Sequence, residues 1–258
     1  MPADDALLEV EDLDLEAGGH RLCSGLGFRV RAGERWGILG PNGSGKTTLL
    51  HTLAALRVPA GGRILYAGTP VERLSRRDCA LHAAIMLQNE DYVFPVTVLE
   101  RALAGRHPHV PVLAWESPRD IDLARRALAR TGLAGFEHRS VLTLSGGERR
   151  RLQIAALLCQ APRLALLDEP ENDLDLRHQT KLMKQLVGEF SGASRALVMV
   201  LHDINLARRY CTHLLLLGVE GARSGPAAMM ATPDRLSALY GCTVRQLDDD
   251  GQPFFVTD

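Results

Sequence analysis

The sequence predicts an α/β fold in which a mainly parallel sheet is covered by helices on both faces. The prediction rests on short apolar runs that recur along the chain, on an amphipathic segment between two of them, and on a glycine-rich loop after the first. Buried strands that alternate with amphipathic helices are typical of such a sheet. The 258 residues, of which 46% are hydrophobic, suffice for one large domain, and we expect a single domain over residues 1–258.

The N-terminal part is expected to form antiparallel strands, because apolar and acidic residues alternate there and a glycine pair supplies a turn. The alternating apolar residues are Leu8, Val10, Leu13 and Leu15, and the turn is Gly18-Gly19. Next along the chain, Trp36–Leu39 predicts a buried strand and Thr48–Leu56 predicts a helix. The apolar runs Leu164–Leu167 and Ala196–Leu201 predict further buried strands. The helix expected between them has one apolar face, formed by Leu182, Met183, Leu186, Val187 and Phe190.

Two regions depart from this alternation. Residues 89–160 have a mostly helical pattern and no good strand run, so we expect a helical subdomain inserted in the α/β core. Residues 221–258 are expected to form a C-terminal extension. It contains a short helix over residues 234–240 and a hairpin in which Val244–Leu247 and Phe254–Val256 flank a turn at residues 249–251.

Composition excludes several classes of protein. The chain has 30 Lys and Arg against 31 Asp and Glu, a net charge of -1, so we expect no nucleic-acid partner, because such binders usually carry a marked basic excess. No apolar stretch approaches the roughly 20 residues that cross a bilayer, and the acidic start is unlike a signal peptide. The five cysteines show no metal-ligand spacing, so we expect most of them to be reduced and buried.

A phosphate-binding loop follows the strand at Trp36–Leu39 and matches the pattern G-x-x-x-x-G-K-[ST]. Its nucleotide-binding candidates are Gly40, Pro41, Asn42, Gly43, Ser44, Gly45, Lys46, Thr47 and the following Thr48. The glycines let backbone N–H groups point at phosphate oxygens, Lys46 reaches the β- and γ-phosphates, and Thr47 is placed to ligate Mg²⁺. A glycine-rich turn with one exposed lysine is the alternative. A P-loop NTPase core is therefore expected, although kinases, GTPases, helicases and transport ATPases all share this loop.

A pair of acids stands at the end of the predicted strand Leu164–Leu167. Asp168 is expected to hold Mg²⁺ through water, and Glu169 to polarise the attacking water. Adjacent side chains of a strand point to opposite faces, but the twist at a strand end can bring both acids near the phosphates. Two surface acids at a strand end are the structural alternative.

A second anion site is predicted before another helix, at Ser145, Gly146, Gly147 and Glu148. A chain with one phosphate loop has no obvious need for a second, so we expect this one to bind the phosphate held by another copy of the chain. A simple helix cap would have the same residues.

The ordered series GPNGSGKTT, Gln88, LSGGE, LALLDEP and His202 resembles an ATP-binding-cassette (ABC) ATPase over essentially the whole chain. The resemblance implies that Gln88 is the Q-loop residue, which senses Mg²⁺ and the attacking water. It makes residues 145–148 the signature loop, Asp175 the D-loop aspartate at a dimer seam, and His202 the switch histidine. Taken alone, His202 would read as an ordinary polar residue after a strand.

The same resemblance implies a mechanism. Two copies sandwich two ATP molecules head to tail, and Lys46, Mg²⁺, His202 and Ser145 of the partner subunit meet the charge on the γ-phosphoryl group. Glu169→Gln is then expected to keep ATP binding, lose turnover and trap the dimer.

Three positions depart from the family pattern. Ala17 stands where the family usually stacks an aromatic residue on adenine, so that contact is expected from His20 or Arg21, or to be absent. Glu171 replaces the usual threonine of the D-loop, and Ala156 stands where many members have arginine. We expect these last two to change dimer or helix contacts without destroying activity.

Within the family, the segments Val96–His109, Leu201–Tyr210 and Ala231–Gly241 resemble the ATPases of metal-chelate importers for iron-siderophore, haem and cobalamin. That resemblance implies transmembrane permease subunits, a periplasmic substrate-binding protein and a place on the cytoplasmic face of the inner membrane. The surface of residues 88–106 would receive the permease's coupling helix, and a solvated loop at residues 106–109 is the alternative there. A soluble ABC ATPase of repair or translation, an ATPase of another transporter class and a P-loop kinase remain as rival functions.

Overall fold

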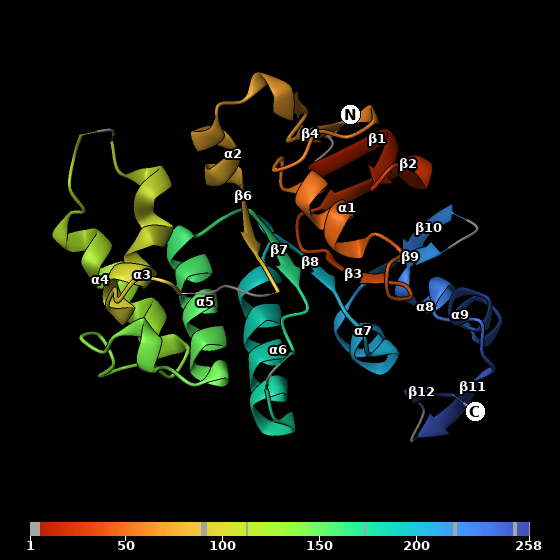
Figure 1. The fold of residues 1–258 in the computed structure, drawn as a ribbon. Coiled ribbons are helices and arrows are strands. Elements are labelled where there is room, and N and C mark those ends of the chain that lie inside the picture. The colour runs from red at the N-terminus through yellow and green to blue at the C-terminus, as the bar shows by residue number, and fades with distance from the viewer. Residues whose placement is uncertain are drawn as a thin grey trace.

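The computed structural model describes residues 6–88, 92–111, 113–172, 174–218, 221–249 and 252–257 (Figure 1). Its strands are β1 (Ala6–Ala17), β2 (His20–Arg31), β3 (Arg35–Leu39), β4 (Gly61–Tyr66), β5 (Thr69–Pro70), β6 (Ala83–Met86), β7 (Leu164–Asp168), β8 (Ala196–Val200), β9 (His213–Gly218), β10 (Gly221–Pro226), β11 (Val244–Asp249) and β12 (Gln252–Thr257). Its α-helices are α1 (Lys46–Leu53), α2 (Arg76–His82), α3 (Val98–Leu103), α4 (Pro118–Arg130), α5 (Gly146–Gln160), α6 (Leu176–Phe190), α7 (Ile204–Tyr210), α8 (Ala227–Met230) and α9 (Pro233–Tyr240).

The central sheet has the strand order β10-β9-β3-β8-β7-β6. Every neighbouring pair in it is parallel except β10 with β9. Val200 of β8 lies opposite both Ile38 of β3 and Asp168 of β7, so these three strands end at one edge of the sheet. The loops that follow them therefore meet there. The predicted α/β fold with a mainly parallel sheet is confirmed.

The N-terminal strands form a second, antiparallel sheet with the order β2-β1-β4-β5. The predicted pairing of β1 with β2 around the glycine turn is confirmed, whereas β4 was not anticipated from the sequence. One apolar core lies between this sheet, helix α1 and one face of the central sheet. A second core packs α6, α7 and α9 on the opposite face.

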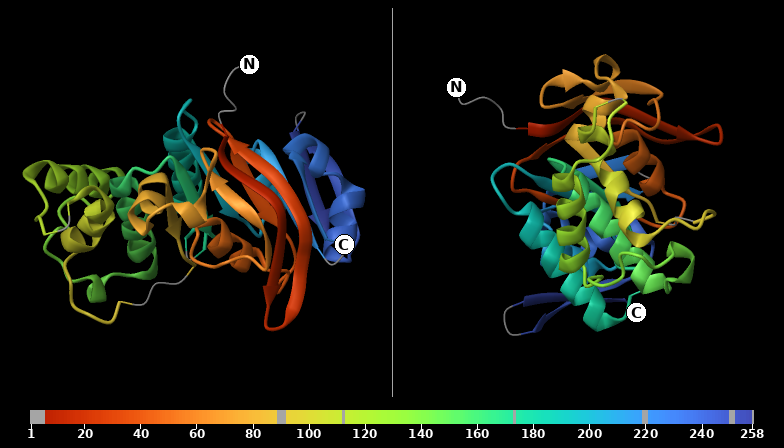
Figure 2. Two further views of the ribbon diagram at one scale, coloured as in Figure 1. Left: turned by 90° about the horizontal axis from the view of Figure 1, so that it is seen from above. Right: turned by 90° about the vertical axis from the view of Figure 1, so that its left-hand side faces the viewer.

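A group of helices, α3 to α5 with two short 3-10 helices, stands at the β6 end of the central sheet (Figures 1 and 2). It has its own apolar core, which includes Val98, Leu128 and Leu152. Among the described residues between 92 and 160, the only β-pairing is an isolated bridge from Thr97 to Ser140. In the described ranges, no helix is both long and apolar enough to cross a membrane.

The cysteines are as expected from the composition. Four of them, Cys23, Cys79, Cys159 and Cys211, are buried, Cys242 is exposed, and all five are free thiols. The C-terminal hairpin is present as β11 and β12, although the turn expected at residues 249–251 lies largely outside the described residues.

Candidate active site

The phosphate-binding loop runs from the end of β3 to the start of α1, and either a positive φ angle or close packing explains its glycines. Gly43 and Gly45 have φ angles of 79° and 99°, which favour glycine. A methyl group on Gly45 would come within 2.6 Å of Leu22, and one on Gly40 within 2.2 Å of the carbonyl oxygen of Leu217. The loop is therefore held against β2 and β9.

Lys46 is buried at the first position of α1. Its Nζ donates hydrogen bonds to the carbonyl oxygens of Gly40 at 2.8 Å and Pro41 at 3.0 Å. Burial lowers the pKa of Lys46, and the carboxylates of Glu169 and Asp168 oppose that shift. The ammonium group thus lies within the loop, held by carbonyl groups that the more negative oxygens of a nucleotide phosphate can replace.

Asp168 ends β7 with its side chain fully buried and with no hydrogen-bond partner of normal geometry for either carboxylate oxygen. Burial raises the pKa of Asp168, and the nearby Thr47 hydroxyl opposes that shift. A buried carboxylate without partners is costly unless a cation neutralises it. Carboxylate and hydroxyl oxygens are ligands of the kind that Mg²⁺ takes in nucleotide sites. Thr47 and Asp168 therefore fit a Mg²⁺ ion bound with a nucleotide.

Glu169 follows Asp168 with a φ of 49°, an uncommon left-handed conformation that turns its side chain out of the strand alternation. Gln88 Nε2 donates to Glu169 Oε2 at 2.6 Å, and Asn172 Nδ2 donates to the same oxygen. His202 Nε2 lies in hydrogen-bond contact with Glu169 Oε1. The structure therefore brings together three residues that the sequence analysis singled out, Gln88, Glu169 and His202. Asn172 lies in the D-loop segment, between Glu171 and Asp175, but the sequence analysis did not single it out as a site residue.

Glu171 lies in the interior of the protein, next to the group formed by Gln88, Glu169 and His202. Its side chain is buried, its Oε1 accepts a hydrogen bond from the backbone N–H of His202 at 3.3 Å, and its Oε2 has no partner. Burial raises the pKa of Glu171, and the N–H groups around it oppose that shift. The carboxyl thus supports the segment that carries His202.

The signature residues lie elsewhere. The phosphate loop follows β3 in the middle of the central sheet, whereas α5 packs beyond the edge strand β6 (Figure 1). Ser145 caps α5 by accepting from the N–H of Glu148 at 3.3 Å, and the Glu148 carboxylate accepts from the N–H of Ser145 at 2.8 Å. Ser145 and Gly146 are exposed. The structure therefore shows the helix cap and leaves this loop open to solvent.

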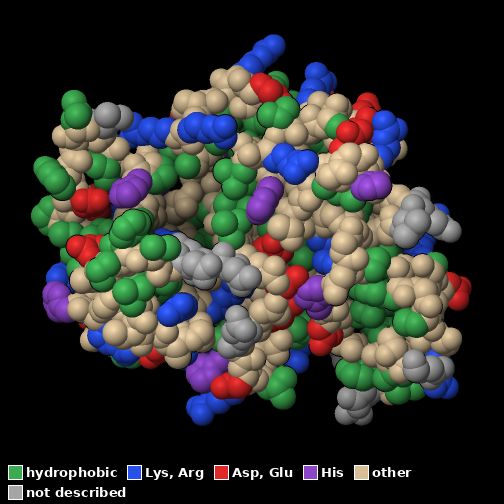
Figure 3. All heavy atoms as spheres, viewed as in Figure 1, with side chains coloured by type: hydrophobic (Ala, Val, Ile, Leu, Met, Phe, Trp, Pro, Cys, Tyr) green, Lys and Arg blue, Asp and Glu red, His purple; other side chains and the backbone are tan. Residues whose placement is uncertain are grey.

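Asp175 and the two residues considered for the adenine contact, His20 and Arg21, are exposed. Asp175 caps α6, where its carboxylate accepts from the N–H of His178 at 2.9 Å. That N–H lowers the pKa of Asp175. Ala17 pairs with His20 at the end of the β1–β2 hairpin, beside Arg21. Figure 3 shows acidic and histidine side chains gathered near the middle of the face where β7 and β8 end.

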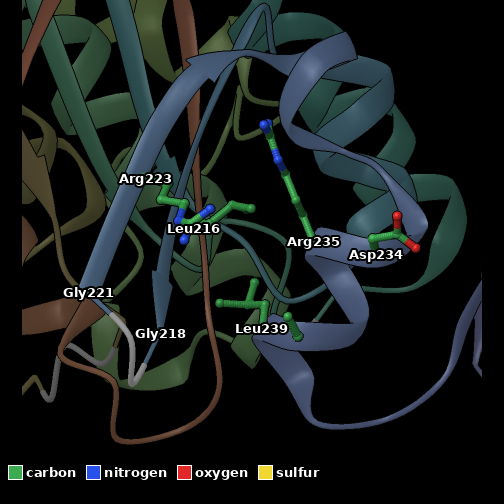
Figure 4. A pocket seen from close by; sticks show the side chains of 8 residues that line it. Leu216, Gly218, Gly221, Arg223, Asp234, Arg235 and Leu239 are labelled. Atoms are coloured by element: carbon green, nitrogen blue, oxygen red, sulfur yellow. The ribbon is translucent and has the colours of Figure 1, made fainter.

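A pocket of about 280 Å³ lies apart from these residues, between β9, β10 and α9 (Figure 4). Arg223 from β10 lies over Leu216, and Leu239 of α9 closes the opposite side. Its lining includes none of the residues that the sequence predicts for nucleotide binding. Among the described residues, no group of three or more His, Cys, Asp or Glu side chains is arranged to hold a metal ion.

Several known proteins are similar in sequence to this chain over more than nine-tenths of its length. The hemin import ATP-binding protein HmuV of Chelativorans sp. is 34% identical over 260 residues, which cover 97% of this chain and 98% of that protein. The ferric enterobactin transport ATP-binding protein FepC of Escherichia coli is 34% identical, covering 97% and 94%. The cobalamin import ATP-binding protein BtuD of Halobacterium salinarum is 36% identical over 92% of this chain, which spans 59% of that protein's length.

A solved structure and a family model agree with these relatives. A chain from a metal-chelate type ABC transporter in an inward-facing conformation superposes with a TM-score of 0.85 at 26% identity, and the match covers 98% of this chain and 97% of that one. The family model described as ABC transporter matches residues 23–172, more than half of the sequence. The chain therefore belongs to the ABC transporter family and has the fold of its ATP-binding subunits.

Proposed function

We propose that the chain binds and hydrolyses ATP to power an importer of a metal chelate. The observation that carries the ATPase part is the hydrogen-bonded group of Gln88, Glu169 and His202 at the sheet edge where the phosphate loop also begins. Glu169 is the general base that takes a proton from the attacking water, and Gln88 and Asn172 hold its carboxylate in place. Lys46 and His202 meet the charge that develops on the γ-phosphoryl oxygens.

Thr47, Asp168 and Gln88 are the residues that would hold Mg²⁺ in this site. The ion would supply neutralisation of the phosphate charge during phosphoryl transfer. The buried, unpartnered carboxylate of Asp168 supports this assignment.

A second copy of the chain completes the site in this proposal. The exposed Ser145 and the glycines after it begin α5, at the positive end of the helix dipole, which suits the γ-phosphate of an ATP held by a partner subunit. Asp175, exposed at the start of α6, would lie at the seam between the copies. Head-to-tail pairing would make two such sites, and opening would follow hydrolysis.

The permease is proposed to dock beside the helical subdomain of residues 89–160. A groove of about 240 Å³ lies there between β6, α3 and α5, and Leu87, Ala104 and Leu157 are among its lining residues. Figure 3 shows this face hollowed between the helical group and the sheet. Val93 and Phe94, which follow the Q-loop, are about three-quarters exposed. The groove is lined by both apolar and polar side chains, the latter including Arg101, Gln153 and Gln160, and such a groove suits a short helix of a partner protein.

The cargo class comes from the relatives, whose names give hemin, ferric enterobactin and cobalamin. All are chelates of a metal, so we propose a metal chelate as the cargo, delivered by a periplasmic binding protein. The chain would then work as a peripheral subunit on the cytoplasmic face of the inner membrane. We propose that it forms one ATPase domain, in which residues 221–258 are a C-terminal extension.

Affinity purification tests the importer part. Tagged Glu169→Gln protein is incubated with ATP and Mg²⁺ in detergent-solubilised membranes, and the proteins that copurify are identified. Lys46→Ala is the control, since it removes the lysine expected to hold the phosphates. A polytopic permease that copurifies with both variants is the expected result. Ribosomal or DNA-repair proteins in its place would overturn the importer proposal in favour of a soluble ATPase.

A further inference from the structure

The guanidinium group of Arg150, buried one turn into α5, binds backbone carbonyl groups of two separate segments. Its hydrogen bonds run from Nη1 to Leu87 O at 3.0 Å and Gln88 O at 3.2 Å, from Nη2 to Asp168 O at 2.8 Å and to Glu169 O, and from Nε to Pro170 O at 3.2 Å. Gln153 accepts a further bond from Nη1 at 2.9 Å. Arginine has five N–H donors in a rigid planar fork, which no other side chain offers.

These two segments carry the residues assigned above to water activation. Leu87 and Gln88 leave the end of β6, and Asp168 to Pro170 form the turn after β7. The Gln88 and Glu169 side chains hydrogen-bond to each other at 2.6 Å, and Arg150 holds the backbone of both residues. The pair is thus joined twice, once through its side chains and once through the guanidinium group.

The turn at Glu169 needs such support. A non-glycine residue in the left-handed region is strained and persists only where the surroundings fix it. Here the N–H of Glu169 donates to Val200 O at 3.2 Å, and its carbonyl oxygen accepts from Arg150. Both sides of the strained residue are therefore tied down, which fixes the direction of its carboxylate.

Arg150 also belongs to the helix that Ser145 caps. It lies five positions after the cap, so the exposed end of α5 and the clamp on the catalytic turn are parts of one rigid element. A shift of α5 would move the guanidinium group relative to the carbonyls it binds.

We propose that Arg150 is a positioning residue for hydrolysis, one that sets the geometry of Glu169 and Gln88 and links it to the position of α5. The inference rests on the proposed function, because it needs Glu169 to act as the base. The Lys46 ammonium group is held by the carbonyl oxygens of Gly40 and Pro41, so we expect loss of Arg150 to act on turnover more than on ATP binding.

The test compares ATPase kinetics of purified full-length Arg150→Lys and Arg150→Gln with the original protein. A lysine keeps the charge but has three donors on one atom, so it cannot span both segments. Displacement of a reacting group by about 1 Å can cost 100-fold, so we expect kcat to fall by about 10- to 100-fold, with the KM for ATP within about threefold. Arg35→Lys is the matched control, because Arg35 Nε also binds a carbonyl, Tyr210 O at 2.8 Å, outside the site.

Rates are normalised to the concentration of ATP-binding sites, and thermal unfolding is recorded for each variant. If Arg150→Gln does not fold, Arg150→Lys alone decides. A kcat within twofold of the original for folded Arg150→Lys would overturn the inference. Glu169→Gln is measured in parallel. If it keeps its turnover, the base assignment in the proposed function fails, whereas an inactive Glu169→Gln beside a fully active Arg150→Lys refutes only the role of Arg150.

Discussion

The substitution Gly40→Ala adds one methyl group and tests whether the phosphate loop must pack closely against β9. That methyl would lie 2.2 Å from the carbonyl oxygen of Leu217 and 2.7 Å from Ser44 Oγ. Ordinary contacts of this kind are about 3.5 Å, so the loop or the strand must move by about 1 Å. Leu217 pairs with Ala222 of β10 inside a six-stranded sheet, so the loop is the part that yields.

Overpacking of this kind costs about 1–3 kcal/mol. Since every 1.4 kcal/mol is tenfold in affinity, and a displaced loop no longer aims its N–H groups at phosphate, we expect ATP to bind about 10-fold or more weakly. Titration of the purified variant with ATP and Mg²⁺ by calorimetry measures the change. Strain that destabilises the whole fold would lower the melting temperature, by about 2–4 °C for each kcal/mol.

Gly188→Ala is the control for Gly40→Ala. Gly188 is exposed on α6, and a methyl group there would meet no heavy atom within 4 Å. Alanine in a helix is better than glycine by about 0.5–1 kcal/mol, so this variant should melt slightly higher and bind ATP unchanged. An affinity for ATP and a melting temperature in Gly40→Ala that both match the original would show that the loop does not need this close approach.

Three further variants test the site. Glu169→Gln should lower the single-turnover rate of ATP cleavage by about 10²- to 10⁴-fold, the usual contribution of a general base, with ATP affinity within threefold; near-normal cleavage would contradict the assignment. Asp168→Asn should raise the Mg²⁺ concentration for half-maximal ATPase by at least about 10-fold, because a ligand charge is lost; an unchanged Mg²⁺ requirement argues against metal binding there. Burial raises the pKa of Glu171 from its ordinary 4.5, so the folded chain holds this proton more tightly, and stability is lost as pH rises from 4.5 through the raised value. Glu171→Gln, which can still accept from His202 N–H, should therefore gain in melting temperature over the original at pH 8 but not at pH 4; a gain that is equal at both pH values would contradict the charge argument.

Much of the fold was predictable because its signals are local. The alternation at the N-terminus, the apolar runs of β3, β7 and β8, and the apolar face of α6 each follow from residues close together in the chain. Strands β4 and β6 were not anticipated. Glycine and arginine occupy the first half of β4, and β6 has only four residues, so neither has the length or alternation that marks a strand.

Some features of the candidate site could likewise be predicted from one continuous segment, whereas others are shown only by the structure. The phosphate loop is one continuous segment, so its pattern alone specifies its backbone and the place of Lys46. The contacts of Glu169 join residues 81 and 33 positions away, Gln88 and His202, and no local pattern shows that they touch. The resemblance to the family placed these residues in order, but only the structure brings them within hydrogen-bond distance.

The sequence by itself determined the family, the nucleotide loop and the alternation of strands and helices, because these depend on short segments and on hydrophobic periodicity. The tertiary structure decided which groups meet: the left-handed turn that directs Glu169, the support of His202 by Glu171, and the guanidinium of Arg150 between two distant loops. Parallel strands from distant parts of the chain end at one edge of the sheet, and side chains that are far apart in sequence become neighbours only when that edge is assembled.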